Sequence, residues 1–336
     1  MKKAIALCAS LLLVLFAFTA CKPKVGGVAA KTQDLLTLVP ATVQGVVMFD
    51  IQNGLKVQAV SDMLKKDEAQ AKLKEFTEKT GIDPLKDIRF LAVGFQTGAS
   101  PDQQEGVGIL NLSYNKDTLL ASLKKQGEVK ELQYQGFTVY VLETEEGKPP
   151  MHGVFLDEAN IVAGSPKTVE AVIDIYKGQK DSLRKNAELM GLVREANKAA
   201  LAWGVFLIPA DALAKAGSQM PMLSGLEALK SGILSVDYQN KNMLIEVKAK
   251  GKDEAKLKQI ADMLNGLKAF GAMAAASKPE IGEVVNKLEV TSGKDFVRLY
   301  VSLPEELIIK LAAEAAKPKP VEVPQEEIPQ NPPDKQ

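Results

Sequence analysis

Apolar and polar residues alternate along two similar stretches of the chain, residues 44–51 and 201–208, as they do in half-buried β-strands. Further along, residues 81–96 match residues 225–239 when a gap of one residue is allowed. The glycine, the acidic residue, both leucines, the lysine, the valine, the aromatic residue and the glutamine then coincide. This agreement predicts an internal repeat, in which one order of strands and helices occurs twice.

Each copy continues with a third strand, a helix and a hairpin that turns on a glycine. The third strands are predicted at residues 108–112 and 243–247, the helices begin near residues 117 and 253, and the hairpins span residues 131–142 and 287–302. The two copies therefore share most of their predicted elements.

The first copy has two additions. Residues 67–79 have the pattern of a charged amphipathic helix, which Gly81 ends. Residues 151–163 predict a second tight hairpin, whose turn is formed by residues 157–160. Other helices are predicted at residues 166–176, 187–200 and 303–316. If folding explains what the copies share, function is expected in what differs between them.

The expected fold class is α+β. Strands joined by short turns form antiparallel sheet, and helices are expected to pack on one face of it. We expect two related halves, residues 34–197 and 198–316. The first strands of the two halves could pair to make one continuous sheet, which the sequence leaves open.

The N-terminus begins with a short basic stretch, after which residues 4–18 are apolar except for Ser10. The run up to Ala20 is at the lower limit of length for a membrane span, and no flanking pattern extends it. Residues 1–20 are therefore predicted to be a signal peptide. An uncleaved anchor and a soluble secreted protein are the alternatives.

The end of this run, Phe18-Thr19-Ala20-Cys21, resembles the lipobox of bacterial lipoproteins. The resemblance implies that cleavage leaves Cys21 at the N-terminus, carrying fatty acyl chains such as palmitate. Residues 21–33 would then form the lipidated cysteine and a flexible tether. Lys22 after the cysteine favours the outer membrane, with the body in the periplasm. The implied partner is the membrane of the cell envelope.

The C-terminal segment, residues 317–336, contains six prolines and few large apolar residues. Such a composition favours extended backbone over helix or sheet and cannot bury an apolar face. We predict a disordered tail that adds nothing to folding.

Composition and charge exclude several classes of function. The 42 basic residues balance the 42 acidic ones, which predicts no nucleic-acid partner. Of the two cysteines, Cys8 leaves with the signal and Cys21 is the expected lipid attachment site. The body then has no thiol for disulfides or metal binding. We predict no cofactor and no metal site.

Candidate chemistry is sparse. His152 is the single histidine and is expected at the surface or at a strand end. Ser165, before Pro166, is expected to cap a helix and not to hold an anion. Asp157 and other acidic residues in turns are expected at solvated hairpin tips. No catalytic residue is assigned, so we predict that the protein is not an enzyme.

The opening Leu38-Val-Pro40 and the turn at residues 81–86 are similar to those of uncharacterised bacterial envelope proteins of unknown function. The resemblance covers most of the body and implies no catalytic residue. It agrees with an envelope location.

The leading hypothesis is a non-enzymatic binding or scaffolding lipoprotein, whose partner, an envelope protein or polymer, meets the additions in the first half. The alternative is a carrier or sensor of a lipid or other apolar ligand, with Met263, Phe270 and Met273 around an apolar cavity. In the leading hypothesis the methionines fill a core. An enzyme of unrecognised type is a third hypothesis.

Overall fold

The computed structural model describes residues 34–96, 105–126, 129–142, 150–210, 213, 221–275 and 279–315. The predicted signal peptide, Cys21 with its tether, and the tail at residues 317–336 lie outside this part of the chain. The structural statements below concern the described residues.

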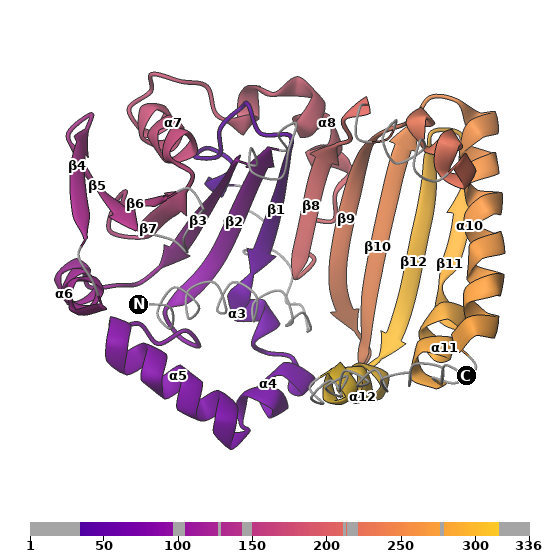
Figure 1. The fold of residues 1–336 in the computed structure, drawn as a ribbon, viewed down its shortest axis with the longest axis horizontal. Helices are drawn as coiled ribbons and strands as arrows, with labels where there is room; N and C mark the ends of the chain where they lie inside the picture. The colour runs from indigo at the N-terminus through magenta and orange to yellow at the C-terminus, as the bar shows by residue number, and fades with distance from the viewer. Residues whose placement is uncertain are drawn as a thin grey trace, which may run out of the picture.

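One antiparallel sheet of twelve strands forms the centre of the fold (Figure 1). In chain order the strands are β1 (Gly45–Asp50), β2 (Ile88–Gln96), β3 (Glu105–Leu112), β4 (Lys130–Tyr134), β5 (Phe137–Leu142), β6 (Met151–Phe155), β7 (Asn160–Gly164), β8 (Ala202–Leu207), β9 (Leu229–Gln239), β10 (Asn242–Gly251), β11 (Glu289–Ser292) and β12 (Phe296–Pro304). Across the sheet they follow the order β11-β12-β10-β9-β8-β1-β2-β3-β7-β6-β5-β4.

The two halves meet in the middle of this sheet. Strand β1 pairs antiparallel with β8, so that Gly45 lies opposite Phe206 and Phe49 opposite Ala202. The first strands of the two repeats therefore join the halves into one continuous sheet. This result settles what the sequence left open, and it leaves the predicted division at residues 197 and 198 inside a single sheet.

The order of strands corrects the predicted match between hairpins. The sequence aligned the hairpin of β4 and β5 with that of β11 and β12. In the sheet, however, β7 lies beside β3 as β12 lies beside β10, and a helix follows each of them. The spatial counterpart of β11 and β12 is therefore the hairpin of β6 and β7, and β4 and β5 are the extra pair. Strand spacing alone could not distinguish the two hairpins, because both are short and turn tightly.

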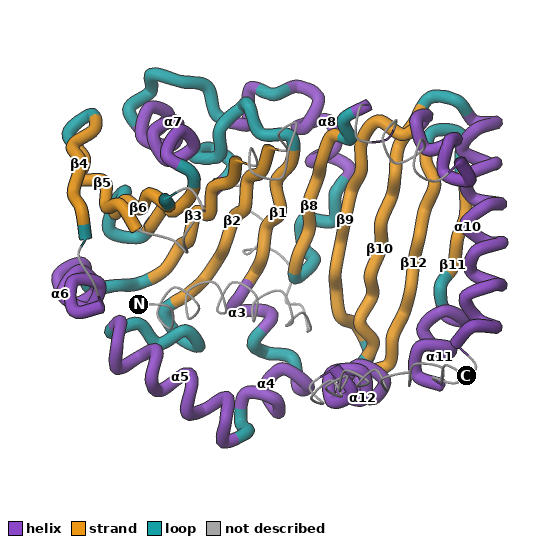
Figure 2. The backbone as a smooth tube through the Cα atoms, viewed as in Figure 1, coloured by secondary structure: helices purple, strands orange, loops and turns teal. Residues whose placement is uncertain are grey.

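Helices flank the sheet (Figure 2). They are α3 (Ile51–Gly54), α4 (Gln58–Leu64), α5 (Asp67–Thr80), α6 (Lys116–Gln126), α7 (Pro166–Tyr176), α8 (Ala187–Glu195), α10 (Glu254–Ala274), α11 (Pro279–Lys287) and α12 (Glu305–Ala315), with the 3-10 turns η2 (Leu183–Lys185) and η3 (Pro221–Ala228). Together with the antiparallel sheet they confirm the α+β class.

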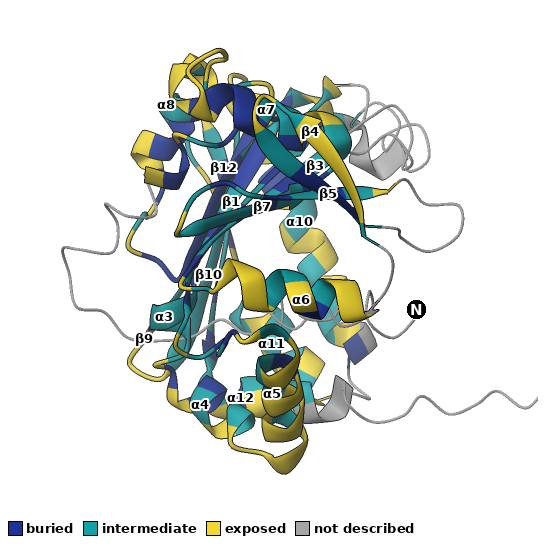
Figure 3. Ribbon diagram, turned by 90° about the vertical axis from the view of Figure 1, so that its left-hand side faces the viewer, coloured by how far each residue is buried: buried dark blue, intermediate teal, exposed yellow. Residues whose placement is uncertain are grey.

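The helices are divided between the two faces of the sheet, whereas one face was expected. Helices α7 and α8 pack with Trp203 and Ile233 in the largest core, on what we call the α7 face. Gly232, the neighbour of Ile233, points to the opposite side and pairs with Ala249, which packs in the core of α10. We call this side the α10 face. Figure 3 shows strands with buried and intermediate residues, and exposed residues along β4, α5 and α6.

Local signals set several helix ends as predicted. Helix α5 ends at Gly81, which has a positive φ of 71° that glycine adopts without strain. Helix α7 starts at Pro166. Helix α8 stops at Glu195, five residues earlier than predicted, and the Lys198 ammonium donates a 3.0 Å hydrogen bond to the carbonyl of Val193. That bond satisfies a carbonyl that the ended helix leaves open.

Two predictions hold for the position in the chain but not for the surroundings of the side chain. Ser165 stands at the N-cap of α7, but its side chain accepts no backbone N–H there. Its hydroxyl lies 2.9 Å from that of Thr168, which itself donates to the carbonyl of Gly106 at 2.9 Å. His152, expected at the surface or at a strand end, is the second residue of β6 and is buried with 8% of its area exposed, because β6 packs against α7.

Candidate functional site

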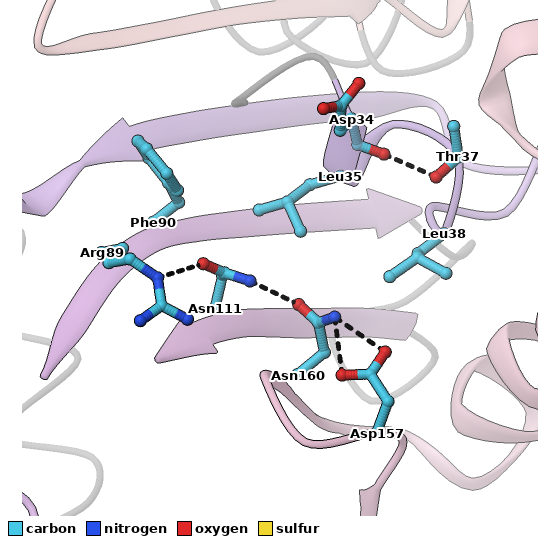
Figure 4. Close-up of a pocket in the computed structure, with 9 residues that line it drawn as sticks. All are labelled: Asp34, Leu35, Thr37, Leu38, Arg89, Phe90, Asn111, Asp157 and Asn160. Carbon is cyan, nitrogen blue, oxygen red and sulfur yellow. Dashed lines mark hydrogen bonds between the residues drawn. The ribbon is translucent and has the colours of Figure 1, made fainter. Parts of the chain in front are cut away.

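A pocket of about 630 Å³ opens on the α7 face, where β2, β3 and β7 come together (Figure 4). It is lined by Asp34, Leu35, Thr37, Leu38, Arg89, Phe90, Asn111, Asp157 and Asn160. The first four belong to the segment before β1, and Asp157 and Asn160 belong to the turn between β6 and β7. The pocket therefore includes the hairpin that the sequence placed among the additions of the first half.

Arg89 owes its position to a β-bulge. Ile88 pairs with Leu112 and Phe90 pairs with Asn111, so the residue between them has no partner in β3. A bulge bends the strand and redirects the extra side chain. The guanidinium of Arg89 consequently reaches β3, where Nε donates to Oδ1 of Asn111 at 2.8 Å and Nη1 donates to Oγ of Ser113 at 2.8 Å.

Both acceptors of Arg89 are neutral, and within the described residues no carboxylate forms an ion pair with it. A guanidinium has five N–H donors in a fixed plane, which leaves three for another group. The carboxylate of Asp34, on the pocket rim, lies 3.8 Å from the guanidinium of Arg184 instead. Arg89 is thus a half-buried cation whose charge is not neutralised by the residues around it.

A chain of hydrogen bonds continues from Arg89 across the pocket floor. Nδ2 of Asn111 donates to Oδ1 of Asn160 at 2.9 Å, and Nδ2 of Asn160 donates to both carboxylate oxygens of Asp157 at 2.9 Å. Oδ1 of Asp157 also accepts the N–H of Ala159 at 2.8 Å. These bonds hold the turn between β6 and β7 against β3, so they fix one wall of the pocket.

Tyr114 supports this turn from behind, because its hydroxyl donates to the backbone carbonyl of Asp157. Burial raises the pKa of the Tyr114 hydroxyl, and the negative charge of Asp157 raises it further. The hydroxyl therefore stays protonated and remains a donor at neutral pH.

The opposite wall of the pocket is apolar. Leu35 and Phe90 are buried and belong to the main core, and Leu38 packs against that core. An apolar wall therefore faces a cationic group that is held by a neutral amide and a hydroxyl. This arrangement suits a ligand in which a carboxylate or phosphate lies next to an apolar group, since a guanidinium fork matches the paired oxygens of such anions.

The second half has a matching bulge with different side chains. Strands β9 and β10 skip Lys230, which therefore corresponds to Arg89, and Lys250 occupies the position that Asn111 has in β3. Lys230 is exposed, and its ammonium donates to the backbone carbonyl of Glu227 at 3.1 Å. The ammonium of Lys250 lies 2.6 Å from Glu195 and 3.1 Å from Asp295. Burial lowers the pKa of Lys250, but its hydrogen bonds to Glu195 and Asp295 outweigh this and raise it. The charge of Lys250 is therefore neutralised within the chain.

The residues proposed for an apolar ligand lie elsewhere, on α10. Met263 is partly buried and packs against the core of that helix. Phe270 and Met273 have 71% and 77% of their area exposed. The expectation that the methionines fill a core is wrong for Met273, and an enclosed cavity does not surround Phe270 or Met273. The role of all three as apolar contacts stays a prediction.

Sequence reasoning did not single out Arg89, Asn111 or Asn160. Arg89 follows a turn rich in charged residues, and only the bulge distinguishes it from an ordinary solvent-facing arginine. Asp157 was expected at a solvated tip, whereas its carboxylate accepts hydrogen bonds from two groups, the N–H of Ala159 and the side-chain amide of Asn160. Helix α5, the other addition of the first half, lines no part of the pocket.

In the part of the chain that the structure describes, no three histidine, cysteine, aspartate or glutamate side chains come together as metal ligands. None of the described helices is both long enough and apolar enough to cross a membrane.

Residues 99–277, more than half of the chain, match the family model described as protein of unknown function, DUF3352. The chain belongs to the DUF3352 family. In this DUF3352 protein the matched segment runs from before β3 to the end of α10, so it includes Asn111, Asp157 and Asn160. No curated protein matches the chain.

Three crystal forms of TP0453 are similar to the DUF3352 chain in overall arrangement. Form I has a TM-score of 0.43 at 9% identity, covering 83% of this chain and 96% of TP0453. Form III has 0.45 at 11% identity, covering 83% and 97%. Form IV has 0.44 at 10% identity, covering 84% and 96%. A likeness at these scores does not bear on function.

Proposed function

We propose that this protein is a lipid-anchored, non-enzymatic binding module of the cell envelope, which captures an envelope protein or polymer through an anionic group at the pocket of Arg89. The observation that carries the proposal is the unneutralised guanidinium of Arg89, which a bulge directs into a pocket with one apolar wall. Burying a cation without a counter-ion is unfavourable, so an incoming anion gains both attraction and directed hydrogen bonds.

The comparison between the halves supports this reading. In the second half the counterpart of Arg89, Lys230, is exposed, and the counterpart of Asn111, Lys250, pairs with Glu195 and Asp295. In the first half the bulge cation is half-buried in a pocket, and a neutral asparagine stands beside it. Because the same bulge forms in the second half with other side chains, folding does not require the Arg89 arrangement, and the difference favours a role in binding.

Binding is favoured over catalysis by the state of the side chains in the pocket. The carboxylate of Asp157 is occupied by an amide and a backbone N–H. His152 pairs with Gly164, at the end of the hairpin away from the pocket. No pair of groups here is arranged for acid–base work in the manner of a catalytic dyad.

Site-specific photocrosslinking in cells tests the pocket. A photoreactive amino acid at Thr37, which is exposed on the pocket rim, should give an adduct with the partner. Arg89→Gln should abolish that adduct. Lys86→Gln is the matched control, because Lys86 is a nearby exposed cation that pairs with Asp83 at 2.6 Å. An adduct of equal yield in Arg89→Gln, or none in the wild type, would show that this pocket is not the binding site.

The lipid anchor rests on the signal-like N-terminus and on Cys21, which lie outside the described residues. A single acyl chain binds membranes marginally, whereas the two or three expected on such a cysteine anchor firmly. Labelled palmitate should enter the wild-type protein and not Cys21→Ser. Equal labelling of the wild type and Cys21→Ser would contradict the anchor. The binding role of the pocket would still be tested independently by the photocrosslinking experiment.

A further inference from the structure

Helix α10 carries large apolar side chains that face solvent. Leu267, Phe270 and Met273 follow one another at intervals of three residues, so they lie along one side of the helix. Their exposed fractions are 40%, 71% and 77%. We call these three residues the apolar stripe. On the adjoining helix α11, Ile281 is 43% exposed.

The two ends of α10 differ in their surroundings. In the first half of the helix, Leu257, Ile260 and Ala261 are buried in the core between α10 and the sheet. Past Leu264, the side-chain amide of Asn265 donates to the carbonyl of Val290 in β11 at 3.3 Å, and a methyl placed on Gly271 would touch Val285 of α11 at 3.8 Å. The apolar stripe lies on a different side of the helix, where it meets none of the described core clusters.

The composition of the apolar stripe favours a lipid surface over a protein partner. Between residues 266 and 273 the only charged residue is Lys268, and the rest are glycine, alanine and the stripe itself. A specific protein contact usually includes hydrogen-bonding groups and a pocket for an anchor residue. Exposed phenylalanine, leucine and methionine on a helix, with a lysine beside them, suit the boundary between lipid head groups and acyl chains.

The position of α10 allows a flat surface to reach the apolar stripe. The helix runs along the outer edge of the molecule beside β11, the terminal strand of the sheet (Figure 1). Asp34, the first described residue, lines the pocket near β2. Six strand spacings separate β2 from β11, a distance of roughly 30 Å. The segment from Cys21 to Asp34 reaches about 40 Å when extended, so anchor and stripe can meet one bilayer.

We infer that the apolar stripe of α10 docks on the surface of the membrane to which the protein is tethered. This inference rests on the proposed lipid anchor, which raises the effective concentration of the apolar stripe at the membrane so that a weak contact is occupied. Docking through the edge of α10 would hold the sheet upright on the bilayer and leave the Arg89 pocket, about 30 Å away, facing the periplasm.

Vesicle flotation tests the inference without the anchor. The mature chain is made from residue 21 onward with Cys21→Ser, so that it carries no acyl group, and is mixed with vesicles of phosphatidylethanolamine and phosphatidylglycerol. We expect measurable partition of this chain. Phe270→Ser combined with Met273→Ser should lower the partition coefficient at least tenfold, because each side chain loses a favourable transfer into lipid.

Leu132→Ser provides the matched control. Leu132 is 48% exposed but lies on β4, the strand at the other edge of the sheet, so its loss should leave partition unchanged. Stripe side chains are exposed, so the double variant should keep the fluorescence of the buried Trp203 and with it the fold. Partition that is absent, or equal in wild type and double variant, would overturn the inference.

Other results separate the stripe from the anchor. A concentration-dependent dimer that the double variant abolishes, without vesicle binding, would mean that the apolar stripe joins two copies, and the inference would be wrong. Vesicle binding together with a failed palmitate experiment would remove the anchor but keep the stripe. Successful palmitate labelling without vesicle binding would keep the anchor and overturn the docking of the stripe.

Discussion

Gly164, the last residue of β7, tests the close packing of β7 against β3 at the start of α7. A methyl group added there would overlap the carbonyl oxygen of Gly106 and lie 2.8 Å from Cα of Val107. These are backbone atoms, so no side-chain rotation relieves the overlap. The same carbonyl of Gly106 accepts the N–H of Ser165 at 2.9 Å and the hydroxyl of Thr168 at 2.9 Å.

The cost of Gly164→Ala follows from these contacts. Overpacking contributes about 2 kcal/mol, and weakening two hydrogen bonds contributes about 2 kcal/mol more. Reduced freedom of the unfolded chain returns about 0.7 kcal/mol. The free energy of unfolding should therefore fall by about 3 kcal/mol. Urea titration followed by the fluorescence of Trp203, the single tryptophan, which is 1% exposed, measures the change.

Gly153→Ala is the matched control, because Gly153 lies on β6 and pairs with Ala163, the neighbour of Gly164. Its added methyl would have no atom nearer than the carbonyl oxygen of Val162 at 3.8 Å. This variant should match the wild type or be more stable by about 0.5 kcal/mol. If the two alanine variants differ by less than about 1 kcal/mol, the close contact at Gly106 does not govern this packing.

Three more predictions concern charge and the tail. Asp50 is buried, and burial raises the pKa of its carboxyl group. The folded state therefore binds the proton more tightly than the unfolded state, so the free energy of unfolding should fall as pH rises from about 4 through the raised pKa. Asp50→Asn should remove this pH dependence in urea titrations. Glu195→Gln should cost less than about 1 kcal/mol in the same assay, because Asp295 still pairs with Lys250; a larger loss would contradict a shared ion pair. Deleting residues 317–336 should leave the melting temperature unchanged, and a large drop would show that the tail is part of the fold.

Local structure was predictable where one residue type decides it. Gly81 ends α5 because only glycine easily takes its positive φ, and Pro166 opens α7 because its missing N–H is not needed there. The alternation of apolar and polar residues located β1 and β8, because successive side chains of a strand point to opposite faces of the sheet. Each of these signals acts within a few residues, so the sequence contains them directly.

The site was not predictable in this way, because it depends on how strands pair. Arg89 becomes a pocket residue through a one-residue mismatch between β2 and β3, which no pattern in either strand reveals. Asn111 and Asn160 meet only after β7 lies beside β3. The exposure of Phe270 and Met273 likewise depends on which side of α10 the sheet occupies, and a methionine-rich helix is equally consistent with a core.

The pairing of β1 with β8 also governs the order in which the protein can fold. Strand β1 forms its contacts with β2 early, but the partner for its other edge is synthesised roughly 150 residues later, and closing such a long loop is slow. Until then the first half exposes a bare row of backbone N–H and C=O groups, which can pair with another chain. Newly synthesised chains therefore pass through a stage in which aggregation competes with completion of the sheet. Chaperones that shield strand edges would act at this stage.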